Sequence, residues 1–424
     1  MVSSPGQSKP ALFFVPHYIG SFKYYEKLIP FLRDRYDIYI LLLFTCKKFF
    51  AEMKDYARLK GYVTKVIEPP RPFFMNAFPP FAFTRDLLYF RREVRRLFNE
   101  TVPLKIISPN DSGPFIRFLF EEAHRRDIET LVLQWAMTYE GSRERIRKQG
   151  SFLRRVLYRI LKPLYVRFKL LAAAMFLGSD LNISKDLTGK GNSDRVGVIN
   201  RQAFDYLLSH GVARTKLSVV GYLDYHFSQT VKETLDRDPA ERTRVAERLG
   251  IDLRKKLIVF FSSPFNGKDI NVLSDAEQFA LTERAMMVMR KVFKKEDFDI
   301  ALKIHPSESL AFYAPLERLG VKLYDKDTNN YELVYFSDLY VAANTAANFM
   351  PLIMGKEVIF VNFLNLSVVN ASQKVFNVKK FVTDYDEFQS LLGRFKDGTL
   401  ERQYSDVENI TTPDSLRKIL DWIG

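Results

Sequence analysis

Three short polar stretches in the second half of the chain follow apolar runs of the kind that form buried strands. They are Ser262-Ser263, His305-Pro306-Ser307-Glu308 and Asn344-Thr345. In open parallel sheets, ligands bind beyond the carboxyl ends of the strands. We therefore expect these residues to meet at one edge of a sheet and to line one binding site.

Within this group, His305 offers the most specific chemistry. It belongs to the run Lys303-Ile304-His305-Pro306, in which the proline ends the strand and leaves the imidazole beside its end. An imidazole there can hydrogen-bond a phosphate and, if protonated, balance its charge. A lone histidine usually carries little information, but this one lies on the predicted ligand edge.

Small and hydroxyl residues begin a helix at Asn344-Thr345, directly after the expected strand 338–342. The free backbone N–H groups and the positive end of the helix dipole at such a place favour a phosphate. Plain N-capping by Asn344 or Thr345 explains the same residues equally well.

The elements that must position these residues alternate between strands and helices. We expect strands at 11–15, 37–44, 104–108, 130–135, 180–184, 217–220, 256–261, 299–304, 321–324, 338–342 and 357–361, and helices at 21–34, 86–98, 115–126, 274–294, 330–336, 345–354 and 415–422. The helix at 274–294 begins with a capping box formed by Ser274 and Glu277. This alternation predicts an α/β protein with mainly parallel sheets.

The length of 424 residues favours two domains, because one core rarely grows past roughly 250–300 residues. Charged residues dominate 232–248, so we expect the connection near 222–245. The predicted division is an N-terminal domain at 1–222, a C-terminal domain at 223–412 and a final helix at 413–424. The single cysteine, Cys46, excludes a disulfide scaffold and a multi-cysteine metal site.

The excess positive charge lies in the first half of the chain. The net charge is +14, with 34 Lys and Arg against 19 Asp and Glu in residues 1–200 and 30 against 31 in the rest. Residues 143–169 hold ten basic residues and one acid, interleaved with apolar residues at helical spacing. Such a basic, amphipathic helical insert suits an anionic membrane surface. The residues expected to face it are Arg154, Arg155, Arg159, Lys162, Arg167 and Lys169.

A second segment, 69–83, is rich in proline and phenylalanine, and it could dip into lipid headgroups. The alternative for both segments is a core helix with a solvated face and a loop packed on the domain.

The sequence carries no nucleic-acid-binding signature. It also has neither an apolar stretch of the ~18 residues that a membrane span needs nor a secretory signal. We therefore expect a cytoplasmic protein, peripheral on the inner face of the cell membrane.

The second half resembles the GT-B-fold transferases of bacterial surface-polysaccharide synthesis that share a His-Pro motif, such as CDP-glycerol glycerophosphotransferases and polysialyltransferases. The likeness covers about residues 205–365. It is carried by 303–306, by Ser337-Asp338 with the small-residue helix start, and by 355–360. Residues 211–224 are similar to the hinge signature of that group and include Gly221, with Leu223 in place of its proline. UDP-N-acetylglucosamine 2-epimerases are similar in architecture.

The resemblance implies two Rossmann-like domains facing a cleft, with a nucleotide-activated donor held by the C-terminal domain. His305 would contact the donor phosphates, Asn344 and Thr345 would cradle them, and Ser262, Ser263 and Gly221 would line the same site. No bound metal or other cofactor is expected. A general base would come from the N-terminal domain. His17, after the first strand, is the first candidate and Asp111 the second, although they could be a turn residue and a helix cap.

We expect a glycosyltransferase-type enzyme that transfers a sugar or a glycerol-phosphate-like unit to a glycan or lipid-linked acceptor. The first alternative is a nucleotide-sugar 2-epimerase, in which Glu308 or Asp111 would have to move protons. The second alternative is a non-catalytic protein that binds membrane surfaces through a GT-B-like fold.

Overall fold

The computed structural model describes residues 9–44, 47–70, 80–135, 188–266, 272–343, 345–366, 369, 378–404, 412 and 414–424. These residues form two compact units. The first takes in the described residues up to 135, residues 188–220 and Arg417–Gly424, and the second takes in the described residues from Gly221 to Leu416. The expected insert at 143–169, with its six membrane-facing residues, and the expected strand at 180–184 lie outside the described residues.

The first unit is built on a parallel sheet of seven strands in the order β3-β2-β1-β4-β5-β6-β7. The strands are β1 (Ala11–Phe14), β2 (Asp37–Leu43), β3 (Thr64–Ile67), β4 (Pro103–Ser108), β5 (Glu129–Leu133), β6 (Arg195–Val198) and β7 (Leu217–Val219). Central strands such as β1 and β2 are nearly continuous apolar runs because helices cover both faces of the sheet. The strand order reverses between β1 and β4.

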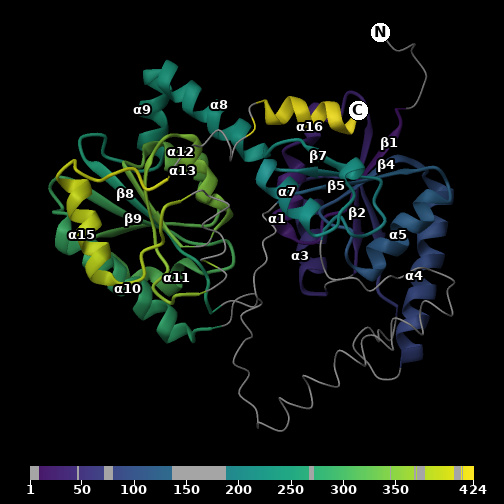
Figure 1. The fold of residues 1–424 in the computed structure, drawn as a ribbon, viewed down its shortest axis with the longest axis horizontal. Coiled ribbons are helices and arrows are strands. Elements are labelled where there is room, and N and C mark those ends of the chain that lie inside the picture. The colour runs from purple at the N-terminus through teal and green to yellow at the C-terminus, as the bar shows by residue number, and fades with distance from the viewer. Residues whose placement is uncertain are drawn as a thin grey trace, which may run out of the picture. The chain divides into compact units, whose positions relative to one another are not determined.

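The helices of this unit connect successive strands, apart from α16, which comes after the second unit (Figure 1). They are α1 (Ile19–Glu26), α2 (Ile29–Leu32), α3 (Lys47–Leu59), α4 (Pro80–Glu100), α5 (Pro114–His124), α7 (Arg201–Ser209), the 3-10 helix η1 (Arg214–Lys216) and most of α16 (Ser415–Ile423). Aromatic side chains join them to the sheet. Phe44 after β2, Phe90 of α4 and Phe115 of α5 pack edge to face, with ring centroids 5.1 to 6.0 Å apart.

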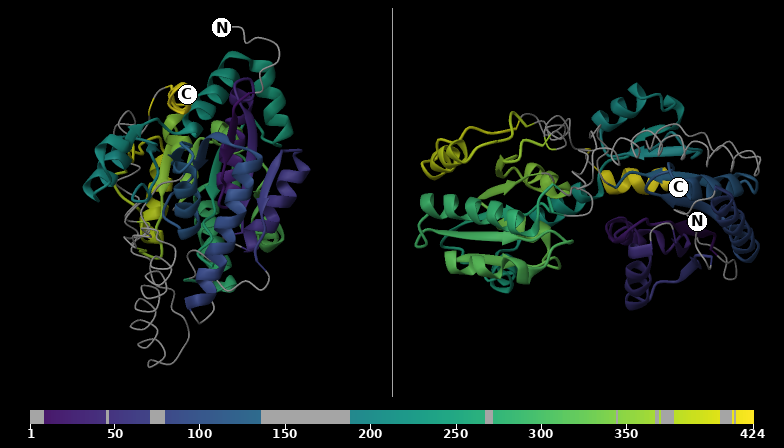
Figure 2. Two further views of the ribbon diagram at one scale, coloured as in Figure 1. Left: turned by 90° about the vertical axis from the view of Figure 1, so that its right-hand side faces the viewer. Right: turned by 90° about the horizontal axis from the view of Figure 1, so that it is seen from below.

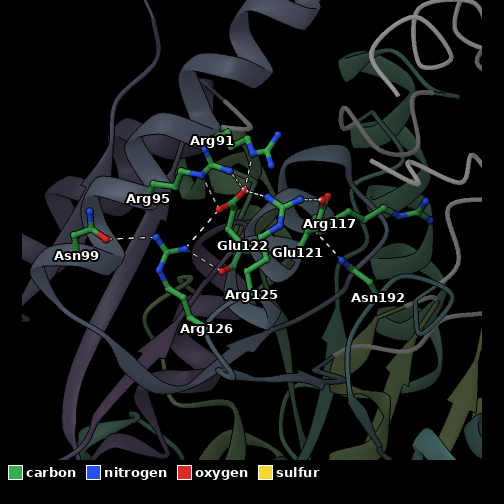
Figure 3. Close-up of polar contacts among 9 residues, drawn as sticks. All are labelled: Arg91, Arg95, Asn99, Arg117, Glu121, Glu122, Arg125, Arg126 and Asn192. Carbon is green, nitrogen blue, oxygen red and sulfur yellow. Dashed lines mark hydrogen bonds and ion pairs between the residues drawn. The ribbon is translucent and has the colours of Figure 1, made fainter. Parts of the chain in front are cut away.

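A buried carboxylate ties α4 to α5, as Figure 3 shows. Glu122 of α5 is 1% exposed and accepts hydrogen bonds from Arg91 (2.6 Å) and Arg95 (2.9 Å) of α4. Arg125 and Arg126 approach the same carboxylate from the end of α5. A buried charge is tolerated only when it is paired and hydrogen-bonded. These arginines therefore offset the desolvation cost of burying the Glu122 carboxylate, and they fix how the two helices pack.

The second unit repeats the plan with a parallel sheet of five strands in the order β10-β9-β8-β11-β12. The strands are β8 (Lys256–Phe261), β9 (Phe298–Lys303), β10 (Val321–Tyr324), β11 (Leu339–Ala342) and β12 (Glu357–Phe360). The helices are α8 (Leu223–Arg237), α9 (Pro239–Arg248), α10 (Asp275–Val292), α11 (Leu310–Tyr313), η2 (Ala314–Leu319), α12 (Asn330–Phe336), η3 (Ala346–Asn348), α13 (Phe349–Ile353) and α15 (Tyr385–Lys396). Figure 2 shows helices on both faces of this sheet.

Helix ends follow the local chemistry of the chain. The capping box expected at 274–277 is confirmed, because the Ser274 side chain accepts from the Glu277 N–H and the Glu277 side chain accepts from the Ser274 N–H. We expected the connection between the domains near 222–245. These residues belong to α8 and α9, and Asp238 caps α9 by accepting from two backbone N–H groups.

The α/β prediction with parallel sheets is therefore confirmed. Strands 256–261 and 321–324 and helix 330–336 match the expected bounds. Within the part of the chain that the structure describes, none of the helices combines the length and the apolar character that a membrane crossing needs.

Candidate functional site

The carboxyl edge of the second sheet holds most of the residues that the sequence singled out. Ser262 and Ser263 follow β8, His305 follows β9, and Thr345 follows β11. The strand order reverses between β8 and β11, and ligands of open α/β sheets bind beside such a reversal. Asn344 lies outside the described residues.

A hydrogen-bond network joins the ends of β8 and β9. The backbone N–H of His305 donates to Ser262 Oγ at 2.7 Å and lies 3.2 Å from Glu308 Oε2. The Ser262 hydroxyl in turn donates to Glu308 Oε2. Ser262 and Ser263 are 2% and 5% exposed, so both side chains are buried. Ser262 holds the turn that carries His305 rather than presenting its own hydroxyl to solvent.

The second oxygen of Glu308 is also occupied. Tyr313 of α11 donates its hydroxyl to Oε1 at 2.6 Å, and Gln278 Nε2 of α10 lies 3.4 Å from it. Gln278 also donates to the Ser263 carbonyl at 3.0 Å. Burial, and then the charge of Glu308, raise the pKa of Tyr313, so this hydroxyl stays a donor. Glu308 therefore receives donors at both oxygens and organises the turn from 305 to 308.

The imidazole of His305 is oriented by Ser307. The Ser307 N–H lies 3.2 Å from His305 Nδ1, and the Ser307 hydroxyl lies 2.8 Å from the same nitrogen. A backbone N–H can only donate, so Nδ1 is the acceptor and the neutral ring carries its proton on Nε2. This tautomer makes Nε2–H a hydrogen-bond donor, the polarity that a phosphate oxygen requires. Pro306 and Ser307 themselves are exposed.

Sequence reasoning missed two residues of this edge, Gln278 and Tyr313, and gave no role to a third, Lys303. Gln278 and Tyr313 come from helices, and no local pattern points to them. Lys303, the last residue of β9, is 2% exposed, and its ammonium lies 3.3 Å from the Ile304 carbonyl. A charged residue at the end of an otherwise apolar strand is a signal that could have identified it, because lysine is almost never fully buried without a reason.

Two further expected donor-binding residues have structural roles in the second unit. Thr345 is the N-cap of η3 and accepts from the Ala347 N–H at 3.3 Å. Gly221 has φ +96°, and a Cβ there would lie 2.2 Å from Ser415 Oγ. Tyr222 N–H donates to the same hydroxyl at 3.2 Å. Glycine is therefore required at 221 by backbone conformation and by close packing.

In the first unit, His17 lies at the reversal between β1 and β4. Its Nε2 is 3.3 Å from Ser108 Oγ, and its Nδ1 is 3.2 Å from the amide nitrogen of Asn110. The Ser108 hydroxyl donates to the Asn110 carbonyl, so Ser108 accepts from Nε2–H and Nδ1 accepts from Asn110. Desolvation lowers the pKa of His17 to about 4. His17 is therefore neutral at pH 7 and engaged at both ring nitrogens.

Asp111 is fully buried, and both of its carboxylate oxygens are hydrogen-bonded. Gly189 N–H and the Ser193 hydroxyl each donate to it at 2.7 Å. A Cβ at Gly191 would lie 2.2 Å from the Asp111 carbonyl oxygen. Asp111 thus anchors the segment that leads into β6, and the structure does not join it to His17.

Comparisons with known proteins agree with this architecture. UDP-GlcNAc 2-epimerase from Methanocaldococcus jannaschii is similar with a TM-score of 0.55 at 10% identity, over 98% of this chain and 99% of that one. The epimerase from Neisseria meningitidis bound to UDP-GlcNAc has a TM-score of 0.54 at 12% identity, covering 97% and 99%. A variant of the wall teichoic acid polymerase TagF has a TM-score of 0.51 at 11% identity, covering 98% and 89%.

The chain has the GT-B fold. Its two parallel α/β units are the two Rossmann-like domains of that fold. No protein-family model matches the chain, and no curated protein matches its sequence. At identities of 10 to 13%, the likeness to these enzymes extends to their fold.

Proposed function

We propose that this GT-B protein is a transferase of cell-surface polysaccharide synthesis. It moves a sugar or a glycerol-phosphate-like unit from a nucleotide-activated donor to a glycan or lipid-linked acceptor, at the inner face of the cell membrane. The donor site is the carboxyl edge of the second sheet. The observation that carries the proposal is the imidazole of His305, which Ser307 orients at Nδ1 while Ser262 and Glu308 hold the backbone N–H of the same residue.

The chemistry of that edge suits a leaving nucleotide. When the bond to the donor phosphate breaks, negative charge grows on a phosphate oxygen, and donors positioned in advance stabilise it. His305 Nε2–H is such a donor, because Ser307 occupies Nδ1. The Neisseria meningitidis structure with this fold is bound to UDP-GlcNAc, which supports a nucleotide-activated donor as the ligand class.

Of the two candidate bases, His17 fits better than Asp111. A base must be unprotonated, and a pKa of about 4 keeps His17 neutral at pH 7. The Asn110 amide would have to leave Nδ1 so that the acceptor hydroxyl could reach it. Asp111 is buried, and its oxygens are already committed to the segment 189–193.

A nucleotide-sugar 2-epimerase is the second candidate, because epimerases share the fold with TM-scores up to 0.55. Glu308 and Asp111 are the acids that we named for proton transfer in that reaction, and both carboxylates already receive hydrogen bonds at each oxygen. Epimerisation through these two residues would therefore require some of these hydrogen bonds to break.

The test measures nucleotide release from UDP-N-acetylglucosamine and from CDP-glycerol, each with and without a membrane extract that contains acceptors. We expect release that requires the extract, and a His305→Ala loss of roughly 10²–10³-fold, the size of a lost oxyanion donor. His210→Ala, in the first unit, is the matched control. Full activity of His305→Ala overturns the assignment of His305. Inversion at C2 of UDP-N-acetylglucosamine without acceptor identifies an epimerase instead.

A further inference from the structure

A hollow lies in the first unit, against the first half of α4. It has a volume of about 690 Å³, and the residues that line it are Pro69, Pro70, Arg85, Leu88, Tyr89 and Arg92. The two prolines follow β3, which ends at Ile67, so the hollow opens beside the carboxyl end of an edge strand. None of the interactions described above for His17 or Asp111 involves these residues.

The polar part of the lining is cationic. Arg85 and Arg92 contribute two guanidinium groups, and the lining includes no acid. Their acidic neighbours lie deeper, because Asp86 is fully buried and the Glu93 side chain is 21% exposed, whereas the arginine side chains are 48% and 73% exposed. Each guanidinium carries five N–H donors in a planar fork that matches phosphate oxygens. The exposed charge therefore suits an anion.

Each of the two arginines pairs with an acid, Arg85 with Asp86 and Arg92 with Glu93. Glu93 is shared with Arg96, and Glu68, next to Pro69, is paired with Lys54 at 2.5 Å, so cations outnumber acids around the hollow. The hollow also belongs to the half of the chain that holds 34 basic against 19 acidic residues. An anionic ligand would therefore meet a positive field at close and at longer range.

The rest of the lining is apolar. Leu88 is 51% exposed on α4, which is unusual for a large hydrophobic side chain on a helix that buries Leu87 and Phe90. The ring of Tyr89 lies under the Arg92 guanidinium, 5.3 Å away, and the two prolines add apolar surface. A free inorganic anion would contact the arginines alone. An anion attached to a hydrocarbon chain would contact the arginines and also the apolar side chains of the lining.

We propose that this hollow binds the phosphate headgroup of an anionic lipid, with Arg85 and Arg92 on the phosphate and Leu88 beside the hydrocarbon. The proposal rests on the part of the proposed function that names an anionic membrane surface as a partner. It assigns that partner to α4 of the first unit. Binding at this hollow requires no donor and no turnover, so it is tested separately from the transfer reaction.

The experiment is co-sedimentation of the full chain with vesicles of phosphatidylcholine and phosphatidylglycerol in equal parts. A basic residue near such a surface contributes roughly 1 kcal/mol, so Arg92→Gln is expected to weaken binding about fivefold and Arg85→Gln/Arg92→Gln about 25-fold. The controls are Arg58→Gln and Arg58→Gln/Arg201→Gln, which remove the same charge from exposed sites of the same unit. Equal losses in variants and controls would mean that only net charge matters, and the site assignment would fail.

Two further arms distinguish a lipid from a free phosphate. Leu88→Gln should weaken vesicle binding more than Leu59→Gln, a change at another exposed leucine. Glycerol 3-phosphate, measured by calorimetry, should bind far more weakly than the vesicles. Tight binding of glycerol 3-phosphate that Arg92→Gln abolishes, or equal binding to pure phosphatidylcholine vesicles, overturns the proposal. Because Arg92 is 73% exposed, that single variant remains informative if loss of Arg85 disturbs the buried Asp86. Nucleotide binding by the same preparations reports on the proposed function independently.

Discussion

The carboxylate of Glu122 provides the sharpest test of how the first unit is held together (Figure 3). We consider Glu122→Gln, which keeps the shape and one acceptor oxygen but removes the charge. Arg91, Arg95, Arg125 and Arg126 would then face an amide in place of a carboxylate. The change isolates the electrostatic contribution, because the volume of the side chain is nearly unchanged.

The magnitude follows from burial. Breaking a buried pair by removing one partner costs about 3–5 kcal/mol. Glu122 is 1% exposed, but the Arg95 side chain is 48% exposed, so solvent screens part of its charge. We therefore expect a loss of roughly 3 kcal/mol in the free energy of unfolding. For a unit of this size that corresponds to a fall of about 6–12 °C in melting temperature.

The control is Glu121→Gln on the same helix. Glu121 is 24% exposed and pairs with Arg125, which is itself 39% exposed, so its loss should cost less than about 1 kcal/mol. Unfolding by urea, followed by far-ultraviolet circular dichroism, measures both variants. If the two substitutions cost the same, burial does not set the value of this carboxylate and the reasoning is refuted.

The pH dependence gives a second check on the same variant. Burial would raise the pKa of Glu122, but the hydrogen bonds from Arg95 and Arg91 outweigh it and lower the pKa. A lowered folded pKa means that the stabilisation is complete above the unfolded value of about 4.3 and is lost as the pH falls through the folded value. The difference between wild type and Glu122→Gln should therefore stay constant down to about pH 5 and shrink in stronger acid.

Three further predictions concern residues first considered for the site. Gly221→Ala should cost roughly 3 kcal/mol in urea unfolding, from its positive φ and the clash with Ser415, whereas Gly398→Ala, with φ +71° and open space, should cost about 1; equal costs would contradict the packing argument. Asp111→Asn should lose about 2 kcal/mol of stability; a variant that keeps its stability and loses only activity would identify a catalytic carboxylate. The imidazole of His17 should titrate near pH 4 by NMR, and because this pKa is lowered, native stability should decline as the pH falls from about 6.5 toward 4; a midpoint near 6.5 would show that the ring is solvated.

The strand–helix alternation could be predicted because strands that are buried on both faces of a parallel sheet have nearly continuous apolar sequences. The run at 256–261 is β8 to the residue. The strands that escaped prediction lack such runs. β3 (Thr64–Ile67) is a short edge strand with polar positions, and β6 contains Gly197, whose missing side chain leaves room for Val220 and Trp422. Edge position and close packing are properties of the folded chain, so sequence patterns carry little of them.

The candidate site also has a part that the sequence predicts and a part that it does not. The segment from His305 to Glu308 could be recognised because its residues are adjacent in sequence. Gln278 and Tyr313, which complete the environment of Glu308, are brought to it by tertiary packing. Sequence reasoning also assigned ligand contacts to Gly221 and proposed catalysis for Asp111, and both roles stay predictions. The structure adds a close contact between Gly221 and Ser415 and a hydrogen bond from the Gly189 N–H to Asp111, and no local pattern pointed to either.

The last residues of the chain complete the first unit. Trp422 packs over Gly197 and under the Arg195 guanidinium, and the Ile423 and Gly424 carbonyls accept hydrogen bonds from Lys105 and Tyr36. About 200 residues are made between Val220 and Arg417, which at 5–20 residues per second takes on the order of 10–40 s. During translation, the nascent first unit must therefore wait, with its surface for α16 uncovered, until residues 417–424 have left the ribosome.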